Sequence, residues 1–190
     1  ELRRALGAFI PAHRLIADPL RRLAYGTDAS FYRLVPRLVV VAEREDEIVR
    51  LLAVCRDREI PVTLRAAGTS LSGQAVTDSV LVVLGDGWKR CEIGPDAGTI
   101  RLQPGVIGGV ANRRLAPFAR KIGPDPASID AAMIGGIAAN NASGMCCGVV
   151  ENAYHTLHSL TVLLPNGLLL DTADPTAPAK LWESAPELAR

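Results

Sequence analysis

Hydrophobic residues follow two patterns along the first half of the chain. Continuous apolar runs at residues 38–41 and 80–84 are typical of strands that are covered on both faces. Between them, the apolar residues of 48–55 lie at the spacing i, i+3, i+4 and i+7, which predicts an amphipathic helix. A third β-prone run follows at residues 60–64. A strand–helix–strand unit needs a crossover, so the pattern predicts parallel pairing.

The second half predicts shorter elements. A hairpin is expected over residues 91–103, around a Gly-Pro-Asp turn. Apolar residues at helical spacing over 107–115 predict a helix that the following proline ends or kinks. Over residues 159–171, apolar residues alternate with polar ones before a Pro-Asn-Gly turn, which predicts a second hairpin.

These elements predict an α+β fold with two subdomains. Residues 1–34 are arginine-rich and interrupted by proline and glycine, which predicts an N-terminal helical extension. Residues 35–90 form the first subdomain, built on the parallel strand–helix–strand unit. Residues 91–190 form the second, a mixed sheet flanked by helices.

Composition excludes several classes of protein. With 48% hydrophobic and 22% charged residues, a chain of 190 residues is globular and buries a sizeable core. The net charge of +1 gives no reason to expect a nucleic-acid partner. No run approaches the roughly 18 apolar residues that span a bilayer, and the arginine-rich start does not resemble an export signal.

The cysteines indicate a reducing compartment. The four of them show no C-x-x-C pair and no metal-ligand spacing with the three histidines. We therefore expect free thiols, a cytoplasmic location and no metal site. Cys146 and Cys147 are adjacent, so a redox pair is conceivable, but two small residues packed beside a cofactor explain them more simply. His155 and His158 are expected to be structural residues.

One glycine-rich stretch, residues 65–75, holds the strongest functional signal. Gly68 and Gly73 permit a positive φ and close approach of another molecule, and the hydroxyls and free amides between them suit a phosphate or pyrophosphate. The stretch matches neither the Rossmann fingerprint nor the P-loop. It also lacks the G-x-S-x-G elbow of a serine hydrolase. The alternative is a surface connection without a ligand.

A second nearly uncharged, glycine-rich stretch runs over residues 123–144, about sixty residues later. Together the two stretches resemble the FAD-binding (PCMH-type) domain of the vanillyl-alcohol-oxidase and p-cresol-methylhydroxylase flavoprotein superfamily, from about Pro36 to Asp171. The sequence Asn-Asn-Ala-Ser-Gly-Met-Cys-Cys-Gly, followed by Tyr154, is most similar to that of FAD-linked D-lactate and D-2-hydroxyglutarate dehydrogenases that are fused to an iron-sulfur module.

The resemblance implies which residues bind FAD. The first stretch would wrap the pyrophosphate, and the second would line the flavin and its phosphates. These residues are Arg65, Ala66, Ala67, Gly68, Thr69, Ser70, Leu71, Gly73, Pro126, Ser128, Met133, Gly135, Gly136, Asn140, Asn141, Ser143 and Gly144. Some relatives attach flavin through a histidine beside the phosphate loop. No histidine lies between His13 and His155, so non-covalent FAD is expected.

The resemblance also implies an activity for the whole enzyme. A D-2-hydroxy acid would transfer hydride to FAD N5, and electrons would pass to an iron-sulfur module, a quinone or a cytochrome, with peripheral association at the inner membrane. Relatives continue with a strand that closes the flavin site and a cap that carries the catalytic residues. We therefore expect a fold truncated before its last strands, with no catalytic residue. The alternatives are a superfamily oxidase of another alcohol or a sugar, and a non-catalytic nucleotide-binding module.

Overall fold

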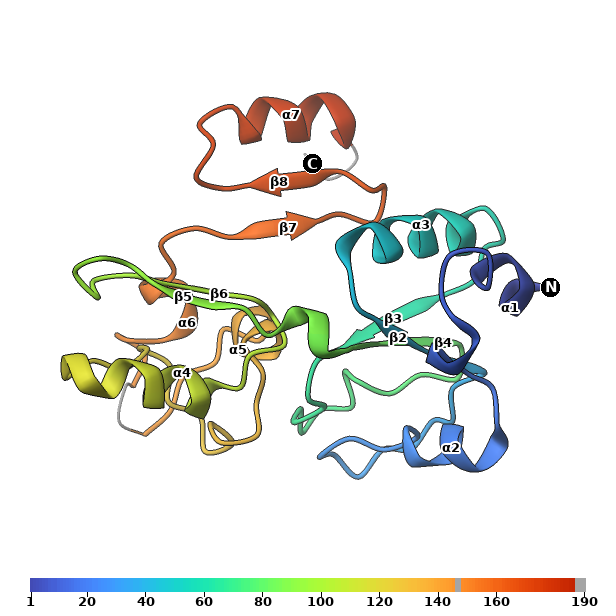
Figure 1. Cartoon of the computed structure of the whole chain (residues 1–190), viewed down its shortest axis with the longest axis horizontal. Coiled ribbons are helices and arrows are strands. Elements are labelled where there is room, and N and C mark those ends of the chain that lie inside the picture. The colour runs from blue at the N-terminus through green and yellow to red at the C-terminus, as the bar shows by residue number, and fades with distance from the viewer. Residues whose placement is uncertain (146–147, 187–190) are drawn as a thin grey trace.

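The computed structural model describes residues 1–145 and 148–186. A four-stranded sheet organises the first half of the chain (Figure 1). Its strand order is β1 (Leu15–Ile16), β2 (Leu38–Ala42), β4 (Val80–Leu84) and β3 (Val62–Arg65). Strands β2, β4 and β3 are parallel, as the strand–helix–strand pattern predicts, and β4 lies between the two strands that α3 (Glu45–Arg56) connects.

The two faces of this sheet carry separate parts of the core. Helices α1 (Leu2–Leu6) and α3 cover one face, where Leu6 and Leu51 pack against the β2 and β4 side chains. On the other face, Val39 and Leu81 are completely buried beside Tyr25, which follows α2 (Pro19–Ala24). Burial on both faces explains why β2 and β4 are continuous apolar runs.

The N-terminal segment contributes more than the expected helices. A 3-10 turn, η1 (Ala12–Arg14), leads into β1, which pairs antiparallel with β2 and makes the sheet mixed. Leu15 and Ile16 are 4% and 3% exposed, so this strand belongs to the core of the first half. A two-residue strand has no periodicity, and the sequence pattern therefore did not reveal it.

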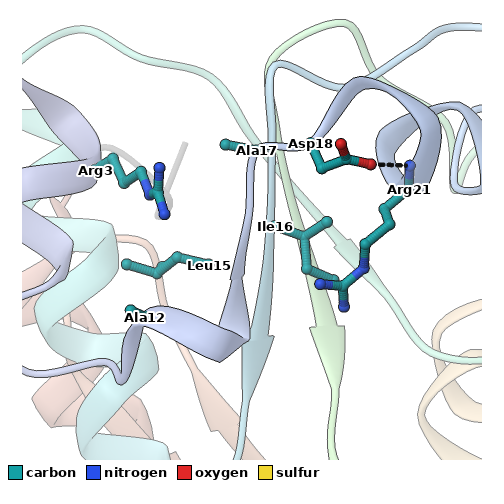
Figure 2. A pocket seen from close by; sticks show the side chains of 7 residues that line it. All are labelled: Arg3, Ala12, Leu15, Ile16, Ala17, Asp18 and Arg21. Carbon is teal, nitrogen blue, oxygen red and sulfur yellow. Dashed lines mark hydrogen bonds between the residues drawn. The ribbon is translucent and has the colours of Figure 1, made fainter.

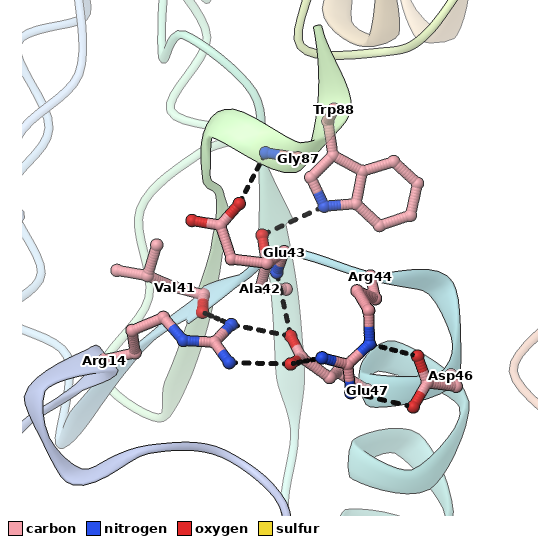
Figure 3. Close-up of polar contacts among 9 residues, drawn as sticks. All are labelled: Arg14, Val41, Ala42, Glu43, Arg44, Asp46, Glu47, Gly87 and Trp88. Carbon is pink, nitrogen blue, oxygen red and sulfur yellow. Dashed lines mark hydrogen bonds and ion pairs between the residues drawn. The ribbon is translucent and has the colours of Figure 1, made fainter. Parts of the chain in front are cut away.

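A buried ion pair joins this N-terminal segment to α3 (Figure 3). Arg14 donates from Nη1 and Nη2 to the two carboxylate oxygens of Glu47, at 2.8 and 2.7 Å. The Glu43 amide also donates to Glu47, whose side chain is completely buried. Burial raises the pKa of Glu47, but the hydrogen bonds from Arg14 and Glu43 outweigh it and hold that pKa below its ordinary value.

The turn after β4 packs on the same end of the sheet. In η2 (Asp86–Trp88), the indole Nε1 of Trp88 donates to the carbonyl of Ala42 at 2.9 Å, and the Gly87 amide donates to Glu43 (Figure 3). These contacts anchor the chain where it leaves the first half.

Both predicted hairpins are present in the second half. Strands β5 (Cys91–Ile93) and β6 (Ile100–Leu102) form one, and β7 (Thr161–Leu163) and β8 (Leu169–Asp171) form the other. Among the described residues, the two hairpins do not pair with each other and form separate two-stranded sheets. Each strand is only three residues long, which leaves little edge for further pairing.

Short helices complete the second half (Figure 1). Helix α4 (Gly108–Leu115) ends as predicted and continues as a 3-10 turn that contains Pro117. In chain order the helical segments are α4 (Gly108–Leu115), η3 (Ala116–Phe118), α5 (Ile134–Ala139), α6 (Ala153–Thr156) and α7 (Ala177–Ser184). Among the helices of the described ranges, none has the length and apolar character needed to cross a bilayer.

Two of the four cysteines can be placed. Cys55 is buried on α3 and Cys91 is half-buried on β5, and both are free thiols. Burial raises the pKa of the Cys55 thiol, which keeps it protonated and unreactive. Cys146 and Cys147, the adjacent pair, lie outside the described residues.

Candidate functional site

The two glycine-rich stretches face each other across a cleft of about 300 Å³. The first stretch leaves the carboxyl end of β3, and the second surrounds α5. The cleft is lined by Thr69, Ser70, Leu71, Ser72, Gln74, Pro126, Ser128, Ala132, Gly136, Ile137, Asn140 and Ala142. Segments about sixty residues apart in sequence therefore form one site. Among the described residues, its lining contains no ionisable side chain.

The first stretch presents unpaired backbone donors. Within the described structure, the amides of residues 67–71 donate to no protein acceptor. Gly68 and Gly73 have φ values of +71° and +72°, which residues with a Cβ rarely adopt. A loop of free amides without charged side chains binds an anion such as a phosphate.

Ser70 shapes this loop. Its hydroxyl donates to the side-chain oxygen of Gln74 and accepts from the Ser72 amide at 3.1 Å. The Thr69 hydroxyl makes no such bond within the described structure and stays available to a ligand. The two hydroxyls that the sequence marks as ligand groups thus have different roles.

Helix α5 forms the opposite wall through Gly136. A Cβ added to Gly136 would meet only the Ala66 Cβ, at 3.8 Å, so this glycine faces open space in the cleft. Its neighbour Gly135 is different. A Cβ there would lie 2.8 Å from the Pro104 Cβ and 3.2 Å from the Pro104 carbonyl oxygen, so Gly135 is required by packing against the chain.

The family model described as "FAD binding domain" matches residues 36–173 of this chain. That range contains both stretches and most of the sheet. The chain belongs to the FAD binding domain family. The structure fits this cofactor, because the unpaired amides suit its pyrophosphate and the side-chain-free surface at Gly136 permits close approach of a flat ligand.

Relatives of this FAD binding domain are flavin-linked oxidoreductases. It is 33% identical over 166 residues to the glycolate oxidase subunit GlcD of Escherichia coli K12, covering 86% of this chain and 33% of that protein. It is 34% identical over 156 residues to the D-2-hydroxyglutarate dehydrogenase of the same organism, covering 80% of this chain and 15% of that protein. The chain thus spans a third or less of these two relatives.

Solved structures share the fold. The FAD binding domain superimposes on an alkyldihydroxyacetonephosphate synthase with a TM-score of 0.76 at 19% identity, covering 94% of this chain and 37% of that one. It superimposes on a chitooligosaccharide oxidase with a TM-score of 0.74 at 20% identity, covering 95% and 38%. The fold of this chain is that of PCMH-type FAD-binding domains, in agreement with the expectation from sequence.

The cleft contains some of the predicted cofactor residues and not others. Those that line it are Thr69, Ser70, Leu71, Pro126, Ser128, Gly136 and Asn140. Those outside its lining are Arg65, Ala66, Ala67, Gly68, Gly73, Met133, Gly135, Asn141, Ser143 and Gly144. Ala66 still lies opposite Gly136, and the free amides of Ala67 and Gly68 belong to the loop that borders the cleft.

Several residues outside the lining hold the walls in place. The Asn141 side chain accepts from the Tyr154 amide at 2.9 Å and so faces α6. A Cβ at Gly144 would clash with the carbonyl of Asp125, so this glycine lets the two ends of the second stretch touch. In the sequence, Asn141 and Gly144 look the same as residues that contact a ligand, because loops of both kinds are rich in glycine and asparagine.

The cleft also contains residues that the sequence-based assignment omitted, namely Ser72, Gln74, Ala132, Ile137 and Ala142. Ser72 and Gln74 lie inside the first stretch, and its polar composition is a signal that could have identified them as site residues. The other three are apolar: Ala132 precedes α5, Ile137 lies within it and Ala142 follows it, and only the packing of that helix reveals that they face the cleft.

The histidines of the described residues take no part in the cleft. His155 Nδ1 lies 2.8 Å from the Val149 carbonyl, a structural contact of the kind expected. Within the described residues, no group of three histidine, cysteine or acidic side chains is arranged to hold a metal ion.

A second cleft, of about 380 Å³, lies beside β1 (Figure 2). Arg3 and Arg21 extend toward it from α1 and α2, and the Asp18 carboxylate accepts from the Arg21 amide at 2.9 Å, which caps α2. It contains none of the predicted site residues and neither glycine-rich stretch.

Proposed function

We propose that the cleft between the two glycine-rich stretches binds FAD without a covalent bond. The observation that carries this proposal is the unpaired row of amides at residues 67–71 opposite the bare surface of Gly136. A volume of about 300 Å³ is at the small end of the range for ligand sites, so the cleft holds part of a dinucleotide. None of the three histidines lines the cleft, which supports non-covalent binding.

Each wall has its own part in this binding. The amides of residues 67–71 and the Thr69 hydroxyl donate to the pyrophosphate, and Ser70 and Gln74 keep the loop in shape. Gly136 and Ala66 leave room for the flat part of the ligand, while Ser128 and Asn140 supply polar contacts at the far wall. The described residues that line the cleft include no acid or base, so we assign them the binding and orientation of the cofactor.

We further propose that the whole protein oxidises a D-2-hydroxy acid, of the D-lactate or D-2-hydroxyglutarate type. The names of the relatives support this substrate class. Bound FAD supplies a hydride acceptor, N5 of the flavin. Electrons would then pass to an iron-sulfur module, a quinone or a cytochrome, and the protein would work in the cytoplasm or peripherally at the inner membrane.

A substrate panel tests this activity. The full-length protein, saturated with FAD, is mixed with dichlorophenolindophenol and with D-lactate, L-lactate, D-2-hydroxyglutarate, glycolate, glucose or vanillyl alcohol. We expect dye reduction with at least one of the 2-hydroxy acids. We expect kcat/KM for D-lactate to be at least about tenfold above that for L-lactate, a difference of roughly 1.4 kcal/mol in the barrier. Activity with only glucose or the aryl alcohol would contradict the proposed D-2-hydroxy-acid substrate but not the proposed binding of FAD.

A further inference from the structure

A short closed loop precedes the family match and touches the first glycine-rich stretch. The Leu34 amide donates to the Gly26 carbonyl at 3.1 Å, and Thr27 and Arg33 form an isolated antiparallel bridge. These contacts close residues 27–33 into a loop. The FAD binding domain match begins only at residue 36, so this loop lies outside it.

Arg65 ties this loop to the start of the glycine-rich stretch. Its Nη1 donates to the Thr27 carbonyl at 2.8 Å and to the Tyr25 carbonyl at 3.3 Å. The guanidinium lies directly against Gly68, since a Cβ at that position would clash with it. Because Gly68 has no side chain, the Arg65 guanidinium can pack directly against its backbone.

Two further contacts hold the middle and the end of the stretch. The Ala29 amide donates to the Gly68 carbonyl at 3.0 Å. The ring of Tyr32 lies against Gly73, where an added Cβ would come within 2.7 Å of Tyr32 Cδ2. The loop over 27–33 thus contacts both positive-φ glycines of the first glycine-rich stretch, Gly68 and Gly73.

Asp28 organises the loop itself. Its Oδ1 accepts from the Ser30 amide at 2.8 Å and from the Ser30 hydroxyl. Burial raises the pKa of Asp28, but the Ser30 hydrogen bonds, the Ala75 amide and the positive charge of Arg65 outweigh it and lower that pKa. The Arg65 charge and the Ala75 amide that act on its carboxylate come from the two ends of the glycine-rich stretch, and its Oδ2 is buried without a hydrogen-bond partner among the described residues.

We propose that residues 27–33 form a clamp that fixes the first glycine-rich stretch in the conformation that binds the FAD phosphates, with Asp28 and Arg65 as positioning residues. This inference rests on the proposed FAD function. A glycine-rich loop is costly to order, and a loop that is ordered before the ligand arrives binds more tightly. The clamp supplies that order from outside the glycine-rich stretch.

Paired variants of one residue type test the clamp. Asp28→Ala removes the acceptor that shapes it, and Asp18→Ala is the matched control, because Asp18 also accepts one backbone amide of the N-terminal segment but serves only to cap α2. The FAD dissociation constant is measured by quenching of flavin fluorescence on FAD-free full-length protein, and the melting temperature is measured on the same samples.

We expect Asp28→Ala to weaken FAD binding about tenfold or more, because it removes the charged acceptor of two hydrogen bonds that shape the loop, while Asp18→Ala changes it less than about twofold. Both variants lower the melting temperature to a similar extent. Asp28→Asn keeps an acceptor for Ser30 and restores part of the affinity. Tyr32→Ala, at a side chain that is half exposed, also weakens FAD binding and decides the matter if Asp28→Ala does not fold.

Equal FAD affinity in Asp28→Ala and the wild type, or an equal loss in Asp28→Ala and Asp18→Ala, would overturn the clamp. With an unfolded Asp28→Ala, unchanged affinity in Tyr32→Ala would do the same. Failure of the wild-type protein to bind FAD is a separate result, which would overturn the proposed function and the clamp together.

Discussion

Gly136→Val is expected to weaken FAD binding by at least about 100-fold, close to 2.7 kcal/mol, without unfolding the protein. The valine branches fill space that the ligand needs, because an added Cβ at Gly136 meets only the Ala66 Cβ, at 3.8 Å. Valine is no worse than glycine inside a helix, so the free energy of unfolding should change by less than about 1 kcal/mol. Flavin titration and urea denaturation of the same preparation measure the two effects.

The adjacent glycine provides the control for this result. Gly135→Ala forces a methyl group against Pro104 and should destabilise the fold by about 1–3 kcal/mol. Its effect on FAD affinity at temperatures well below unfolding should be much smaller than that of Gly136→Val. If the two variants lose FAD equally, or if Gly136→Val binds it like the wild type, the cleft at α5 is not the cofactor site.

Arg14→Met is expected to destabilise the protein by about 3–5 kcal/mol, because it leaves the carboxylate of Glu47 buried without its main partner. Arg44→Met is the matched control. Arg44 also reaches Glu47, at 3.3 Å, but its side chain is 60% exposed, so its loss should cost less than about 1 kcal/mol. Urea denaturation at pH 7 compares the two, and equal losses would contradict a dominant role for the buried pair.

The ion pair between Arg14 and Glu47 also makes the free energy of unfolding depend on pH. The pKa of Glu47 is lower in the folded protein than its ordinary value of 4.5, so its contribution is complete above that value and is lost as the pH falls through the folded pKa. The wild type should therefore lose stability below about pH 4.5. Arg14→Met, which has already lost the pair at pH 7, should decline less steeply; parallel pH curves would show that other groups cause the loss.

The sequence predicts the central sheet well because its signals are local. The runs at 38–41 and 80–84 are apolar throughout, since both faces of the sheet are covered. The glycines at 68 and 73 also signal their own backbone requirement, a positive φ. Strand β1, by contrast, is two residues long and owes its existence to pairing with β2, which no local pattern records.

The site is harder to predict residue by residue, because neighbouring glycines can have opposite roles. Gly135 packs on Pro104, about thirty residues earlier in the chain, whereas Gly136 faces the cleft. The Arg65 side chain is turned back to Thr27, a contact across 38 residues. Composition identifies the two stretches that form the site, but only the tertiary contacts separate residues that line it from residues that hold it in shape.

The central claim is that the cleft between these stretches binds FAD without a covalent bond. The most direct test is the visible absorption spectrum of the full-length protein after incubation with excess FAD and desalting, followed by precipitation with acid. The account predicts flavin bands that stay with the folded protein and appear in the supernatant after precipitation. A protein that remains colourless after this treatment, or a flavin that stays in the precipitate, would contradict it.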